Sequence, residues 1–212
     1  MSRWLRPLLV ALATTPPLVA QGRPPVPPAI AALATRLQAD ATLPDSLPRL
    51  SAGDLLGPQF PRNVRYLPDP GVLEFIGVVA DVWRSAPSSV CLAILREETE
   101  SGYDTWYLLA AADPGLADRY AQVLEAMIRG MAGGLPGGSV ATRAALREGM
   151  IAAIGGLPAA DQQRMARIAQ NPPATPEDLC WTSVQTLTSL TGLPPGQQAP
   201  VVRAMFAGPA DR

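Results

Sequence analysis

The hydrophobic residues of this chain recur every three or four positions, which is the spacing of one face of an α-helix. The clearest case is residues 69–84, where the positions on one face are Val72, Phe75, Ile76, Val79 and Trp83. Asp69 and Pro70 supply a capping side chain and a first-turn proline, which are typical of a helix start. Because the same stretch is rich in β-branched residues, a strand is the alternative prediction.

The same periodicity, combined with start and stop signals, predicts helices along most of the chain. They cover residues 28–40, 88–98, 105–112, 113–131, 139–154, 158–170, 175–191 and 195–207. The strongest start signal is Thr175-Pro176-Glu177-Asp178, a capping threonine with an acid three residues later. Proline-rich residues 43–70, with one helical turn near Asp54, are expected to wrap over the helices as an irregular segment anchored by Phe60 and Tyr66.

Residues 90–112 are the most ambiguous part of the pattern. The polar window EETESGYD, residues 97–104, separates two apolar runs, so the segment fits either two short helices or a β-hairpin. The prediction is an all-α, irregular bundle of about six to eight helices. An α+β fold with a small hairpin at 90–112 is the alternative.

The tripeptide Gly-Leu-Pro occurs three times, beginning at Gly134, Gly156 and Gly192. Each copy fits a helix end at which glycine takes the left-handed conformation, leucine packs back and proline prevents continuation. Short turns of this kind favour antiparallel neighbours within a bundle.

The first 20 residues, MSRWLRPLLVALATTPPLVA, have the basic start, short apolar run and small residue before a possible cleavage site that are typical of a signal peptide. The apolar run is too short to span a bilayer, so no stable membrane insertion is expected after cleavage. Residues 21–29 are interpreted as a proline-rich spacer and residues 30–212 as a single helical domain. The expected location is secreted or periplasmic.

Cys91 and Cys180 are the only cysteines in the sequence. In an oxidising compartment such a pair is expected to form a disulfide, and two unpaired buried cysteines are the alternative. The sequence has neither a Cys-x-x-Cys motif nor a histidine that would activate a thiolate, which disfavours a redox or nucleophilic role.

Composition narrows the possible chemistry. The chain has no histidine and no lysine, which disfavours histidine-based catalysis, histidine-ligated zinc, Schiff bases and P-loop phosphate binding. The loss of Arg3 and Arg6 with the signal would change the formal charge from −1 to −3, so no nucleic-acid partner is expected. No cofactor is predicted. Arginine as the only basic residue is typical of a GC-rich bacterial genome.

One short motif points to an enzyme. Glu100-Ser101-Gly102-Tyr103, at the end of a predicted helix, resembles the Glu-Ser-Gly-aromatic signature of lytic transglycosylases, which fold as lysozyme-like helical domains and cleave peptidoglycan. The resemblance implies that Glu100 is the catalytic acid, a role that requires a carboxyl with a raised pKa in an apolar setting. The family's following Gly-Leu-Met-Gln segment is absent.

A solvated helix end is the simpler interpretation of this acidic window. Its carboxylates, from Glu97, Glu98, Glu100 and Asp104, would also suit calcium, but the EF-hand spacing is absent and no metal site is predicted.

Aromatic side chains are the remaining candidates for binding. Core packing is the simpler role for these residues, and lining a glycan or ligand groove is the alternative. They are Trp83, Trp106, Tyr107, Tyr120 and Trp181.

The sequence therefore favours a non-catalytic binding or structural protein of the bacterial envelope, whose partner would be another envelope protein or a glycan. A transglycosylase-like enzyme using Glu100 is one alternative. A small-molecule binding protein with a pocket between helices is the other.

Overall fold

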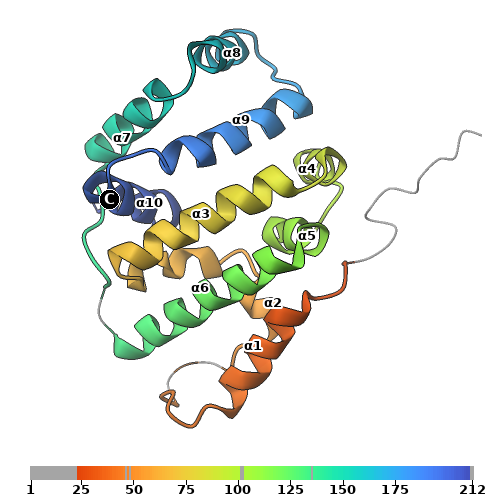
Figure 1. Cartoon of the computed structure of the whole chain (residues 1–212), viewed down its shortest axis with the longest axis vertical. Coiled ribbons are helices and arrows are strands. Elements are labelled where there is room, and N and C mark those ends of the chain that lie inside the picture. The colour runs from red at the N-terminus through yellow and green to blue at the C-terminus, as the bar shows by residue number, and fades with distance from the viewer. Residues whose placement is uncertain (1–22, 46, 48, 101–102, 135, 211–212) are drawn as a thin grey trace, which may run out of the picture.

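The computed structural model describes residues 23–210 except positions 46, 48, 101–102 and 135 (Figure 1). This part of the chain forms ten α-helices and the 3-10 helix η2, with no strand. The helices are α1 (Pro28–Ala39), α2 (Ala52–Leu55), η2 (Phe60–Tyr66), α3 (Asp69–Ser85), α4 (Ser88–Leu95), α5 (Asp104–Ala111), α6 (Pro114–Gly133), α7 (Arg143–Gly155), α8 (Ala159–Gln170), α9 (Pro176–Leu190) and α10 (Pro195–Ala207). The predicted signal peptide, residues 1–20, lies outside the described residues.

The all-α prediction is confirmed, and both strand alternatives are wrong. The described residues form more helices than the six to eight predicted, because the irregular segment contains α2 and η2 and residues 88–112 form two short helices. Residues 69–85 are α3, and the proposed hairpin at 90–112 is α4 followed by α5. The ambiguity arose because α4 is short and buried on several sides, with Val90, Cys91, Ala93 and Ile94 all buried. A short helix of this kind shows no clear hydrophobic period.

Helix α3 is the centre of the molecule. It packs against α6, α9 and α10, and Figure 1 shows it crossing between α6 and α9. Its buried residues are Val72, Phe75, Ile76, Val78, Ala80 and Val82. They face more than one side of the helix, as expected for a helix that has neighbours around most of its circumference.

The segment between α1 and α3 does wrap around the helices, through α2 and η2. Helix η2 packs against α6 and α10, and Phe60 is the buried anchor that was predicted. Tyr66 is only half-buried, while the neighbouring Val64 and Leu67 are fully buried. The aliphatic residues beside Tyr66 therefore make the second anchor.

A single buried guanidinium ties three parts of the chain together. Arg203 of α10 is fully buried and donates to the carbonyl oxygens of Leu67, at 2.7 Å, and Ser139, at 3.1 Å. It also pairs with the carboxylate of Asp69 at 2.7 Å. A Cβ at the nearby Gly137 would lie 1.9 Å from the same carbonyl oxygen of Leu67, so this close approach of two backbone segments requires glycine.

Helices α7 and α8 lie at the edge of the bundle, beyond α9 (Figure 1). Helix α7 packs on α9 and α10, and its buried residues are Gly149 and Ala153. Helix α8 has no buried residue. The core is thus formed by α1 to α6, η2, α9 and α10, with Ala153 of α7 at its edge, and α8 contributes no buried residue to it.

None of the described helices is by itself long and apolar enough to cross a membrane. Helices α3 and α4 reach that length and composition only as a pair, and they are bent by 102° at the break between them.

Candidate ligand-binding pocket

A pocket of about 410 Å³ lies where the C-terminal helices α9 and α10 meet α3. Helix α5 and the buried Tyr120 of α6 complete its wall, and η2 contributes Pro61. The lining residues are Pro61, Phe75, Val79, Trp83, Asp104, Thr105, Tyr120, Leu179, Thr182, Ser183, Thr186, Leu187, Met205 and Phe206.

One wall of the pocket is a stripe of α3. Phe75, Val79 and Trp83 follow one another at intervals of four residues, so they lie on one side of the helix. The ring of Phe75 meets that of Phe206 edge to face, with centroids 5.0 Å apart. Leu179 and Met205 remain 40% exposed, so large apolar side chains also reach solvent at the pocket.

Two polar groups in this lining have no partner in the described part of the chain. Asp104, the first residue of α5, is half-buried; burial raises the pKa of its carboxyl, and no hydrogen bond or ion pair offsets that effect. The hydroxyl oxygen of Thr182 is buried and has no hydrogen-bond partner. Because the Thr182 oxygen is enclosed, the carboxyl of Asp104 is the unpaired polar group of the lining that a ligand can reach.

Tyr120 is the other titratable side chain in the lining. Burial raises the pKa of its phenol, while a hydrogen bond from the neighbouring Thr105 partly opposes that shift. The phenol is therefore neutral at physiological pH, and Asp104 is the source of charge in the pocket.

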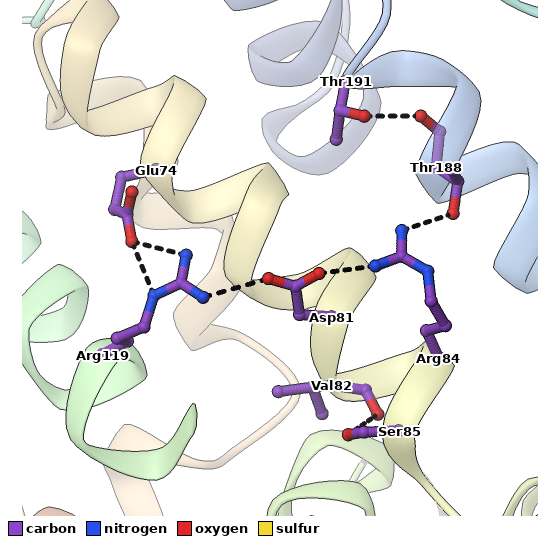
Figure 2. Close-up of polar contacts among 8 residues, drawn as sticks. All are labelled: Glu74, Asp81, Val82, Arg84, Ser85, Arg119, Thr188 and Thr191. Carbon is purple, nitrogen blue, oxygen red and sulfur yellow. Dashed lines mark hydrogen bonds and ion pairs between the residues drawn. The ribbon is translucent and has the colours of Figure 1, made fainter. Parts of the chain in front are cut away.

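By helical spacing, Glu74 and Asp81 lie on the side of α3 opposite Val79. They belong to a chain of ion pairs, which Figure 2 shows. Arg119 of α6 bonds Glu74 at 2.9 Å and Asp81 at 3.0 Å. Arg84 bonds the other oxygen of Asp81 at 2.6 Å and donates to Thr188 of α9 at 3.1 Å. Two arginines and two acids satisfy one another, so this network joins α6, α3 and α9 and leaves no charge available for a ligand.

Glu100, the sequence candidate for a catalytic acid, lies outside the pocket. Its exposed carboxylate pairs with Arg23, whose guanidinium also stacks over the ring of Tyr103, 3.9 Å from the centroid. The hydrogen bond from Arg23 lowers the pKa of Glu100. These surroundings favour the ionised carboxylate, whereas a general acid requires the protonated form. Its catalytic role stays a prediction; Ser101 and Gly102 lie outside the described residues.

The acidic window is divided among different surroundings. Glu97 and Glu98 close the end of α4, Glu100 pairs with Arg23, and Asp104 lines the pocket. In the described ranges, no group of three or more acidic, cysteine or histidine side chains is placed to hold a metal ion.

The candidate aromatic residues also separate. Trp83 and Tyr120 line the pocket, whereas Trp106 and Tyr107 are buried in the core. Trp181 stacks beneath the guanidinium of Arg164, 4.2 Å from its ring centroid. Sequence reasoning did not single out Asp104 as a pocket residue, because only the placement of α9 and α10 on α3 reveals the pocket.

Residues 23–27, which precede α1, pack on α5. The indole nitrogen of Trp106 donates to the carbonyl oxygen of Pro24 at 3.0 Å, and Pro27 is buried. This part of the proline-rich segment therefore has a fixed place on the molecule.

The predicted disulfide between Cys91 and Cys180 is confirmed, with the two Cα atoms 5.9 Å apart. It joins α4 to α9, one residue after Leu179 of the pocket wall. Arg96 and Glu177 form an ion pair at 3.2 Å between the end of α4 and the start of α9. The first turns of α9 are thus fixed to α4 by a covalent bond and a surface ion pair.

A second hollow, of about 490 Å³, lies between the end of α1 and the residues that follow it, which include Leu43, Leu47 and Leu50. Its lining includes Asp40, whose carboxylate accepts hydrogen bonds from Thr42 and pairs with Arg129 at 3.4 Å. Asp45 and Arg49 also line this hollow, so it carries charges of both signs, and its lining has none of the aromatic side chains found in the pocket beside α3.

Compared with models of known protein families, with curated proteins and with solved structures, the chain gives no significant match.

Proposed function

We propose that this chain is a non-catalytic binding protein and that its ligand is a small, largely apolar molecule held between α3, α9 and α10. The observation that carries this proposal is the pocket of about 410 Å³, with its aromatic and aliphatic wall and the unpaired carboxyl of Asp104. Ligand sites in proteins are typically apolar concavities of this size with a few polar groups that orient the ligand.

The arrangement of the polar groups supports binding rather than chemistry. Asp104 and Tyr120 are the titratable side chains of the lining, and neither contacts a described group that would activate it for proton transfer.

The proposed location is secreted or periplasmic, in a bacterium. The Cys91–Cys180 disulfide is compatible with an oxidising compartment. The signal-peptide pattern of residues 1–20 supports the same location.

The binding proposal is tested with a neutral apolar probe, 1-octanol, read by thermal unfolding and by tryptophan fluorescence. Trp83 in the wall makes fluorescence a local report. A ligand at about 100 times its Kd adds about 2.7 kcal/mol to the free energy of unfolding. The expected result is therefore a saturable rise in Tm.

A matched pair of variants locates the site. Thr186→Trp fills the pocket from α9, while Gln163→Trp adds the same side chain on the exposed surface of α8. Thr186→Trp should abolish the response and Gln163→Trp should keep it. No response in the wild type, or an equal response in both variants, would contradict the proposal.

A further inference from the structure

We propose that the pocket selects an organic cation, a protonated amine or quaternary ammonium carried on an apolar body, with the positive group held at Asp104. This inference rests on the proposed function and specifies the chemistry of its ligand.

The first argument is charge. Asp104 is the only charged side chain among the described residues that line the pocket, and no arginine reaches it. Arg84 and Arg119 bind Asp81 on the opposite side of α3, and Arg203 of α10 binds Asp69. Arg62 and Arg65 of η2 line a separate hollow next to Phe206 and are not part of the pocket lining. The pocket therefore has one uncompensated negative charge. A cationic ligand would neutralise this charge, whereas an anionic ligand would place a second negative charge beside it.

The second argument is the surroundings of that charge. Removing a carboxylate from water is unfavourable unless a cation or hydrogen-bond donor replaces the lost solvation. Burial removes water from around the carboxyl of Asp104 and therefore raises its pKa. A ligand ammonium would supply the missing partner, and its apolar body would cover the wall formed by Val79, Leu187 and Met205.

The third argument is the aromatic wall. The rings of Phe75, Trp83, Tyr120 and Phe206 line the same pocket, and aromatic faces attract cations as well as apolar groups. The molecule uses this contact elsewhere, where the guanidinium of Arg164 lies 4.2 Å from the ring centroid of Trp181. A carboxylate combined with aromatic rings suits an ammonium group better than it suits a neutral donor.

The test compares three probes with the same number of carbon atoms: octylammonium, 1-octanol and octanoate. Their affinities are measured by tryptophan fluorescence and calorimetry at pH 7. Octylammonium is expected to bind at least about tenfold more tightly than 1-octanol, with octanoate the weakest of the three.

Two variants assign that preference to a residue. Asp104→Asn keeps the shape of the side chain and removes its charge. It should therefore close the gap in affinity between octylammonium and 1-octanol. Glu100→Gln removes a nearby carboxylate that lies outside the pocket and should leave the gap unchanged. Circular dichroism and thermal unfolding check that both variants fold.

A pH series on the wild type gives the same information without a substitution. Octylammonium keeps its charge in acid, whereas Asp104 loses its charge, so the gap should close as the pH falls through the pKa of Asp104. Tyr120, the other titratable group of the lining, stays neutral throughout.

The outcomes separate this inference from the proposed function. Equal affinities of the wild type for the three probes would overturn the cation preference and keep the binding function. The same conclusion would follow if the gap persisted in Asp104→Asn or at low pH. If no probe bound, the proposed function itself would fail, and the cation preference with it.

Discussion

Glu97 occupies a backbone conformation that usually holds glycine. Its φ is 58°, and it follows the last turn of α4. The amide of Glu98 donates to the carbonyl oxygen of Ala93 at 2.8 Å. The amide of Glu97 donates to the carbonyl oxygen of Ile94 at 3.1 Å. These two bonds are the Schellman motif, in which the left-handed residue is most often glycine because a Cβ is unfavourable there.

Glu97→Gly is therefore expected to raise the free energy of unfolding by about 0.5–1 kcal/mol, after the larger chain entropy of glycine is subtracted. Urea denaturation measures the change. Glu97→Ala is the control, because it removes the same carboxylate and keeps the Cβ. An equal gain in both variants would assign the effect to charge instead of backbone conformation.

The three Gly-Leu-Pro sequences show how far residue patterns predict helix ends. Gly134 has a φ of 70° and closes α6, as predicted. The prediction is wrong for Gly156, whose φ is −79°, and for Gly192, which is not among the described residues of positive φ. At those two turns, Pro158 and Pro194 prevent α7 and α9 from continuing as helices. Both prolines are extended and directly precede α8 and α10.

Arg203 is expected to be among the most costly residues to replace. Arg203→Met keeps much of the side-chain volume but leaves the carbonyls of Leu67 and Ser139 without their donor. A loss of about 2–4 kcal/mol in the free energy of unfolding is expected. Asp69→Asn keeps both carbonyl bonds but removes the negative charge beside the buried guanidinium, so it should cost about 1–3 kcal/mol, less than Arg203→Met. Chemical denaturation compares the two, and equal losses would mean that the ion pair matters more than the carbonyl bonds.

At the scale of helices, the sequence predicted positions well. Residues 175–191 were expected to be helical, and α9 is Pro176–Leu190. Its start is fixed by local chemistry, since Thr175 accepts a hydrogen bond from the amide of Asp178 at 3.1 Å. Helix α4 ends at Leu95, three residues earlier than predicted, because Glu97 takes the left-handed conformation.

The pocket was not predictable in the same way. Its lining comes from η2, α3, α5, α6, α9 and α10, and it brings Pro61 together with Phe206. Periodicity identifies which face of each helix is buried but does not specify which other helix that face meets.

The disulfide is expected to stabilise both the fold and the pocket wall. Replacing Cys91 and Cys180 together by serine should lower the free energy of unfolding by about 2–5 kcal/mol, because the bond closes a loop with a sequence separation of 89 residues. The first turns of α9, which include Leu179, should also become more mobile. The pocket, whose wall includes Leu179, should therefore bind 1-octanol more weakly.

Denaturant unfolding and probe titration measure these two effects. Arg96→Gln is the control, because it breaks only the surface ion pair with Glu177 and should cost under about 1 kcal/mol. If the serine variant unfolded at the same denaturant concentration as the wild type, the stabilising role of the bond would be refuted.

For the molecule as a whole, Asp104 and Glu100 should affect the pH dependence of stability in opposite directions. Burial raises the folded-state pKa of Asp104, so its charge destabilises the fold at neutral pH, and this penalty disappears as the pH falls below that pKa. Arg23 lowers the pKa of Glu100, so its contribution is present at neutral pH and is lost in acid.

Asp104→Asn should consequently be more stable than the wild type at pH 7, and the difference should shrink in acid. Glu100→Gln should be the less stable variant at pH 7, and its deficit should shrink over the same range. Thermal unfolding from pH 7 to pH 3 measures both trends. A constant difference for Asp104→Asn would show that its carboxyl is not desolvated.

The peripheral position of α8 has a consequence for how the molecule responds to proteolysis. Arg167 is exposed on a helix without buried side chains, where local opening is easiest and trypsin can cleave. That position lies between Cys91 and Cys180, so a cut there leaves both products joined through sulfur. The nicked protein would migrate as one species on a denaturing gel and separate into two polypeptides only after a reductant is added.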